Sequence, residues 1–312
     1  MKKIPLCLTL LPFLLGIIFQ TGLAFLHTSF FSISIDKKDE FFHSESNFAY
    51  VHTPNTPNES DNGNTKYDIL LSSGFLAFGR HIGFLKALEE CVGREKVSKI
   101  VGTSSGAFIG AMWSAGYSAD EISGLISSKR PFQLLRPAFR FWRGAISFGP
   151  LIKYLDRDID KLPANIESLR IPTYLGVTTM DKQNVLLNSG PVARGVAASC
   201  AVPGIFSSVE VNGILYQDGG VSDRLALTSW LELDDRTSDI IIHIIEPKVS
   251  SDKSVPINEA YTLDENKVSA VCVTSKSSEA NLFSFKNLDH EVNESYIQSL
   301  QTLKQMLVAN KS

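Results

Sequence analysis

Cysteine is scarce in this chain of 312 residues, which contains four. Cys7 lies in an apolar N-terminal stretch, and Cys91, Cys200 and Cys272 are too far apart for the spacing of a zinc site. A disulfide framework is equally unsupported, because the three remaining cysteines are odd in number. We interpret them as small buried apolar residues with free thiols, and we expect no metal.

Clusters of positive charge are also missing. The net charge is −3 and no stretch is rich in lysine and arginine, so the composition offers no electrostatic basis for binding nucleic acid. Hydrophobic residues make up 44% of the chain, enough for a full core. We therefore expect one catalytic domain with tails and no nucleic-acid partner.

The N-terminus carries two lysines followed by an uncharged stretch, Ile4 to Leu26. Small residues at Gly22 and Ala24 are typical of signal-peptidase cleavage, which predicts a signal peptide over residues 1–24 and a protein that enters the secretory pathway or is secreted. Retention of residues 4–26 as a membrane anchor is the alternative. A third reading, a two-part plastid presequence, is weakened by the acidic residues that follow.

The remainder of the chain divides by composition. Residues 25–66 are polar, contain prolines and lack a sustained period, which predicts a disordered linker or presequence. Residues 67–250 carry the strand and helix patterns of a catalytic domain. Residues 251–312 are predicted to form a C-terminal extension with an amphipathic helix that packs on the domain. Residues 247–287, at the junction of the two, are weakly patterned and predict loop.

The most informative stretch is Gly102-Thr103-Ser104-Ser105-Gly106. The apolar run Val97 to Val101 before it predicts a buried strand, and Ala107 to Trp113 after it predicts a helix that is apolar nearly all round. The glycines leave the backbone free of Cβ atoms on both sides of the turn, so Ser104 can adopt a strained conformation with its hydroxyl exposed. This pattern predicts a nucleophile elbow.

The elements around this turn predict an α/β fold. A strand at Asp68 to Leu71 and a helix ending at Gly93 precede the elbow strand, which gives a parallel strand-helix-strand unit. Further predicted elements are a hairpin of 173–180 with 185–188, a helix at 192–199, a type I′ hairpin around Asn212-Gly213 and a strand at 240–245. Residues 131–148 favour a core helix or packed loop, with a lid or lipid-facing surface as the alternative.

Asp218 follows a predicted strand and precedes two glycines, so its carboxylate can approach a neighbouring loop closely. Partial burial there would raise its pKa and suit it to act as a base for Ser104. Backbone N–H groups of Gly74, Phe75 and Leu76, at the mouth of the first strand and helix, are the candidate oxyanion donors. Both groups would share the carboxyl edge of one sheet with Ser104.

From about Tyr67 to Ile245 the chain resembles the patatin-like phospholipases, lipid acyl hydrolases with a Ser-Asp dyad. The segments that carry the resemblance are Ser72 to Leu88, Gly102 to Gly106, Ala198 to Phe206 and Asp218-Gly219-Gly220.

The resemblance implies a three-layer α/β fold with a mainly parallel central sheet. It also implies Ser104 as nucleophile, Asp218 as base and hydrolysis of acyl esters of glycerolipids, either phospholipids or galactolipids, at a membrane surface. No metal or other cofactor is implied, and protein partners stay unknown. The motif glycines are Gly102, Gly106, Gly219 and Gly220.

Two segments depart from the family pattern. The first loop, which in the family holds several glycines and then a basic residue, keeps only Gly74 and has Ala77 at the basic position, with Arg80 as a candidate substitute. After the Asp-Gly-Gly segment, Asp223 and Leu225 stand near the positions of the usual asparagine and proline.

Two other functions compete with the dyad hydrolase. An α/β-hydrolase with a Ser-Asp-His triad would use His243 or His290, although His243 lies inside an apolar run and reads as a core residue. A catalytically inactive patatin-like lipid-binding protein is the other alternative. It is supported by the first loop, which keeps only one of the several glycines usual in the family.

Overall fold

The structure is a computed structural model that describes residues 49–52, 65–129, 131–138, 144–247, 268–282, 284–285 and 287–309. The predicted signal peptide, the candidate anchor over residues 4–26 and Cys7 lie outside the described residues. None of the helices in the described ranges is long and apolar enough to cross a membrane.

Five parallel strands form the centre of the sheet, in the order β11-β10-β2-β3-β6. Their runs are apolar and mostly buried, as expected for strands covered on both faces. Their bounds are β2 Tyr67–Leu71, β3 Val97–Thr103, β6 Thr173–Thr179, β10 Asp239–Ile245 and β11 Ser269–Ser275. The α/β prediction with a mainly parallel sheet is confirmed.

Antiparallel strands flank this centre. β7 (Asn184–Leu187) and β9 (Ile214–Asp218) both pair with β6, and β8 (Val209–Val211) pairs with β9. In the β8–β9 turn Asn212 and Gly213 have φ values of 50° and 83°, the left-handed conformation that the Asn-Gly pair predicted.

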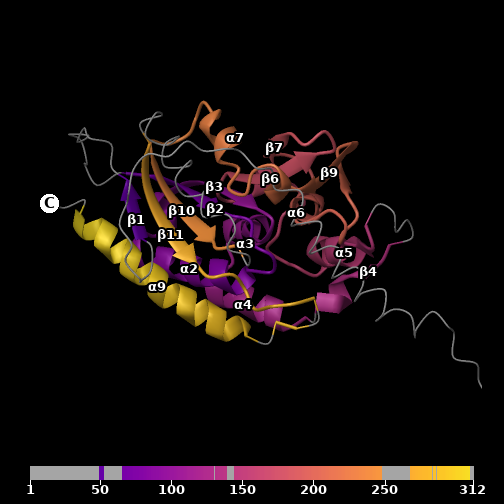
Figure 1. Cartoon of the computed structure of the whole chain (residues 1–312), viewed down its shortest axis with the longest axis horizontal. Helices are drawn as coiled ribbons and strands as arrows, with labels where there is room; N and C mark the ends of the chain where they lie inside the picture. Colours follow the sequence, from indigo (N-terminus) through magenta and orange to yellow (C-terminus); the bar gives the residue numbers. More distant parts are fainter. Residues whose placement is uncertain are drawn as a thin grey trace, which may run out of the picture.

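Helices cover the two faces of the sheet unequally (Figure 1). α9 lies along one side of the molecule next to α2, whereas the short α7 stands on the opposite side of the sheet. The helix bounds are α2 Phe78–Cys91, α3 Ser105–Ser114, α4 Ala119–Ser127, α5 Gly149–Arg157, α6 Val192–Ser199, α7 Leu227–Leu231 and α9 Leu288–Ala309.

Alternate residues of β2 show how the layers form. Ile69 and Leu71 belong to the large core under the main helix layer, and Leu70 belongs to a smaller core that includes Trp230 of α7. The described residues thus form a large helical layer, the sheet and a thin third layer.

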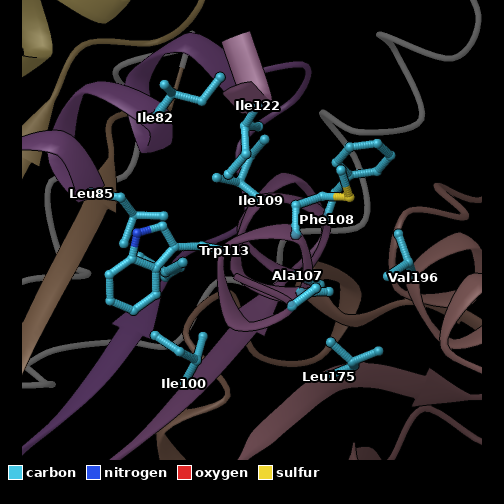
Figure 2. Packing of buried hydrophobic residues seen from close by; sticks show 14 of the residues in the cluster. Ile82, Leu85, Ile100, Ala107, Phe108, Ile109, Trp113, Ile122, Leu175 and Val196 are labelled. Atoms are coloured by element: carbon cyan, nitrogen blue, oxygen red, sulfur yellow. The ribbon is translucent and has the colours of Figure 1, made fainter. Parts of the chain in front are cut away.

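At the centre of the large core, side chains of α3 meet those of the sheet and of neighbouring helices, as Figure 2 shows for Ala107, Ile109, Trp113, Leu85, Ile100, Leu175 and Val196.

Two predictions of irregular chain are wrong for short segments. Within the predicted linker, β1 (Ala49–His52) pairs antiparallel with β11, and within the predicted loop 247–287 β11 itself pairs with β10. Serine and threonine at the ends of β11 weaken its apolar pattern, but Ala270, Val271 and Val273 are buried and the neighbouring strands satisfy its backbone groups. The C-terminal extension therefore completes the sheet.

The described residues of the stretch 131–148 form no core helix. They contain a 3₁₀ turn at Pro131–Leu134 and a small hairpin of β4 (Arg136–Pro137) and β5 (Ile146–Ser147), while residues 139–143 lie outside the described ranges.

Cys91, Cys200 and Cys272 form no disulfide among the described residues, and each is half-buried rather than fully buried as predicted.

Candidate active site

Ser104 lies on the turn between β3 and α3, with φ 55° and ψ −118°. This conformation is strained for a residue with a side chain. The glycines on either side provide space: a Cβ on Gly102 would lie 2.6 Å from the Gly106 carbonyl oxygen, and one on Gly106 would lie 2.4 Å from the Leu71 carbonyl oxygen. α3 therefore begins in direct contact with the strand ends.

Side chains at the end of α6 hold this turn. The backbone N–H of Ser104 donates to Ser199 Oγ at 2.8 Å, and the Ser199 hydroxyl donates to the Gly176 carbonyl oxygen on β6 at 2.6 Å. The Cys200 thiol donates to the Ser104 carbonyl oxygen at 3.2 Å. The Ser199 hydroxyl thus satisfies the Ser104 N–H, which the strained turn removes from the sheet pattern, whereas the Ser104 carbonyl oxygen also accepts the Phe108 N–H at 3.1 Å in the helix.

Asp218 ends β9 and lies opposite Val177 of β6. Its backbone N–H donates to the Ala201 carbonyl oxygen at 2.9 Å, and the Gly220 N–H donates to its Oδ1 at 2.8 Å. A Cβ on Gly219 would lie 2.3 Å from the Gly176 carbonyl oxygen, so this glycine is required for the chain to pass β6. The same β6 residue thus contacts the segments that position Ser104 and Asp218.

The side chains of Ser104 and Asp218 both lie in the interior, with 8% and 4% of their surface exposed. Burial raises the pKa of Asp218 to about 6, although the nearby Ser104 hydroxyl, the Gly220 N–H and the charge of Arg224 lower it in part. Asp218 Oδ2 has no hydrogen-bond partner among the described residues. A carboxylate in this state can accept a proton, and such contacts commonly tighten once substrate is bound.

The predicted oxyanion donors lie at the edge of the same site. Phe75 and Leu76 line one cavity together with Ser104, and Leu76 has a left-handed φ of 56°. Gly74 packs tightly, since a Cβ there would lie 2.8 Å from Ile245 Cγ2. Among the described residues, the N–H groups of residues 74–76 have no hydrogen-bond acceptor.

The cavity beside Ser104 is almost wholly apolar and measures about 90 Å³. Lys129 is the one charged side chain among its described lining residues, and its Nζ lies 5.2 Å from the centre of the Tyr154 ring. Other lining residues come from α3, α4, α5, the loop after α6 and the segment before α9, among them Phe108, Met112, Leu125, Ile126, Leu151, Leu155, Val202, Phe206, Leu282 and Phe285.

The basic residue whose charge acts on Asp218 is Arg224, and the suggestion of Arg80 is wrong. Arg80 is 4% exposed and its Nη1 lies 2.5 Å from Glu294 Oε2 on α9, away from the cavity. Arg224 Nη2 instead donates to the carbonyl oxygens of Ser73 and Ile245 at 3.0 and 2.6 Å.

The candidate triad histidines lie elsewhere. His243 is fully buried, and its ring nitrogens lie 2.9 Å from His81 Nδ1 and 2.9 Å from Ser275 Oγ. Burial lowers the pKa of His81 to about 3 and that of His243 well below its ordinary value. His290 is exposed on α9, and none of the described cavity-lining residues is a histidine.

Sequence reasoning missed two residues that organise the site, Ser199 and Arg224. Ser199 falls in a segment whose resemblance to the family was noted, but its bond to Ser104 N depends on where α6 packs. Arg224 follows Asp218 closely in the chain, and only its position in the fold reveals its contacts. Among the described residues, no group of three or more His, Cys, Asp or Glu side chains could hold a metal ion.

The fold and this site define an α/β protein that presents a serine on a strained strand-to-helix turn beside a buried aspartate. A family model described as patatin-like phospholipase matches residues 69–229, just over half of the chain. The chain belongs to the patatin-like phospholipase family, and membership supports lipid hydrolysis at the level of the family.

Several sequence relatives and one solved structure are similar to parts of this chain. Uncharacterized NTE family proteins of Mycobacterium bovis and Mycobacterium tuberculosis are each 35% identical over 166 residues, which cover 51% of this chain and 44% of the relative. The chain thus matches less than half the length of those proteins. The crystal structure of VipD from Legionella pneumophila aligns with a TM-score of 0.53 at 12% identity, covering 86% of this chain and 72% of VipD, a likeness of fold.

Proposed function

We propose that this protein is a serine acyl-ester hydrolase that cleaves acyl esters of glycerolipids, phospholipids or galactolipids, through an acyl-enzyme. The observation that carries the proposal is Ser104 on a strained turn at the wall of an apolar cavity, with the buried Asp218 close enough for the Ser104 hydroxyl to lower its pKa. Ser104 is the nucleophile and Asp218 the general base.

The first half of the reaction forms the acyl-enzyme. As Ser104 Oγ attacks the ester carbonyl carbon, its proton passes to the Asp218 carboxylate, and the carbonyl oxygen becomes an oxyanion that accepts hydrogen bonds from the N–H groups of residues 74–76. The tetrahedral intermediate then expels the alkoxide, which takes the proton from Asp218 and leaves as the alcohol. The acyl chain stays on Ser104, with its apolar part in the cavity.

Water completes the cycle. Asp218 takes a proton from the attacking water, the acyl-Ser104 bond breaks, and the proton returns to Ser104 Oγ as the fatty acid leaves. The raised pKa of Asp218 suits both directions of transfer near neutral pH.

The test compares wild type with Ser104→Ala for labelling by a fluorophosphonate probe and for hydrolysis of a soluble acyl ester. Wild type should be labelled and active, and Ser104→Ala should be folded, unlabelled and inactive. Near wild-type turnover by Ser104→Ala would show that another group attacks. A folded wild type that neither labels nor hydrolyses, yet binds lipid vesicles, would favour the inactive lipid-binding alternative.

For localisation, we propose entry into the secretory pathway by cleavage after Ala24, with retention of residues 4–26 as an anchor or plastid delivery as alternatives. The N-terminal residue of the mature protein decides between cleavage and retention. The substrate would in each case be met at a membrane surface.

A further inference from the structure

Arg224 joins three segments that converge on the site. Its Nη2 donates to the Ser73 carbonyl oxygen at 3.0 Å and to the Ile245 carbonyl oxygen at 2.6 Å. Its own carbonyl oxygen accepts from the Ser73 N–H at 2.7 Å. Arg224, six residues after Asp218, therefore holds the loop that leaves β2 and leads into the candidate oxyanion donors, and it also holds the end of β10.

The two loops also touch directly. A Cβ on Gly220 would lie 2.6 Å from Ser73 Oγ, so the turn that carries Asp218 packs on the residue that Arg224 holds. A shift of Ser73 would change the position of residues 74–76 relative to both Asp218 and Ser104. Charge-assisted bonds to two carbonyl groups resist such a shift, because a planar guanidinium donates in fixed directions.

The charge of Arg224 acts in addition to its bonds. The groups around the Asp218 carboxylate are the Ser104 hydroxyl, the Gly220 N–H, the Cys200 thiol and the Arg224 guanidinium. Arg224 is the positive one among them, and it lowers the pKa of Asp218 against the effect of burial.

We infer that Arg224 is a positioning residue of the hydrolase, which fixes the oxyanion loop against the loop of the base. The inference rests on the proposed function. Arg224 thus supplies the positive charge for which the sequence suggested Arg80. Arg80 is paired with Glu294 and cannot supply it.

The experiment uses the full chain with Arg224→Gln, Arg224→Lys and the control Arg194→Gln, an arginine of α6 whose Nη1 donates to the Glu210 carbonyl oxygen at 3.1 Å on the surface. Arg224→Gln should move the acidic limb of the kcat/KM profile on a soluble ester to higher pH. Arg224→Lys keeps the charge and should leave that limb in place, but kcat should fall by roughly 10- to 100-fold through misplacement of the donors. Arg194→Gln should change neither.

A second readout does not depend on turnover. In a double-mutant cycle at pH 7.5, Arg224→Gln should lower Tm more in the wild-type background than in Asp218→Asn, because the charge it compensates is then absent. The inference would be overturned if the folded Arg224 variants kept both the acidic limb of the kcat/KM profile and the kcat of wild type. It would also be overturned if Arg224→Gln lowered Tm equally in the wild-type and Asp218→Asn backgrounds. If wild type were inactive but the effects of Arg224→Gln and Asp218→Asn on Tm were coupled, the proposed reaction would be rejected. The electrostatic interaction of Arg224 with Asp218 would then still stand.

Discussion

Ser199 Oγ accepts the backbone N–H of Ser104 at 2.8 Å and donates to the Gly176 carbonyl oxygen at 2.6 Å. One hydroxyl thus joins the elbow to the strand that also contacts Gly219. The nucleophile turn and the base turn share this support, so damage to it should affect turnover as well as stability.

Ser199→Ala should destabilise the protein and lower turnover. The change leaves a buried N–H and a buried carbonyl group without partners, which costs roughly 1–3 kcal/mol. Thermal melting and the rate on a soluble ester measure both effects. Ser299→Ala is the matched control, because Ser299 is buried and its Oγ has no partner among the described residues, and it should be neutral. Equal behaviour of the two variants would contradict a supporting role for Ser199.

Asp218→Asn should lower the rate by roughly 10²- to 10⁴-fold, because the amide cannot take the Ser104 proton. Wild-type kcat/KM should correspondingly rise with pH through about 6, the pKa of Asp218. Retention of most activity by a folded Asp218→Asn variant would remove Asp218 as the base.

The same variant should be more stable than wild type at neutral pH. Burial raises the pKa of Asp218 from 3.8 to about 6, so between these values the native state binds more protons than the unfolded state, and stability falls as pH rises. The difference corresponds to about 3 kcal/mol at most. The melting advantage of Asp218→Asn should therefore be largest above pH 6 and vanish near pH 4; an advantage independent of pH would contradict the ionisation argument.

His243→Ala should destabilise without removing catalysis. It leaves His81 Nδ1 without its buried partner and removes one of the two buried partners of Ser275 Oγ. It also opens a cavity beside Phe84, whose ring stacks on His243 with the ring centres 4.5 Å apart. The rate per folded molecule on a soluble ester should stay near that of wild type. Loss of turnover in folded His243→Ala, together with an active Asp218→Asn, would support the triad alternative.

Met112→Ala should shift the preference of the hydrolase toward longer acyl chains. Ser104, Phe108 and Met112 recur every four residues along the start and body of α3 and all line the cavity, which gives the acyl chain a path of about 12 Å. Turnover of a series of p-nitrophenyl esters measures the shift. Ile109→Ala on the same helix is the control, because Ile109 is equally buried but does not line the cavity. The same chain-length profile in both variants would contradict this path.

Much of the fold could be predicted from local pattern. The strand before Ser104, the helix after it and the hairpin at Asn212-Gly213 all depend on residues close together in the chain, and the structure has each of them. The strained turn at Ser104 belongs to this group as well, since its neighbouring glycines are what allow it.

The sequence by itself determined the elbow, the order of most strands and helices, and the candidate residues Ser104 and Asp218. Only the tertiary structure decided that β1 and β11 extend the sheet, that His243 pairs with His81, and that Arg224 rather than Arg80 stands beside Asp218. The physical reason is the distance along the chain between the residues that interact. Turns and periodicity depend on neighbouring residues, whereas the pairing of edge strands, the burial of side chains and the positions of charged side chains depend on segments that meet only after the chain has folded.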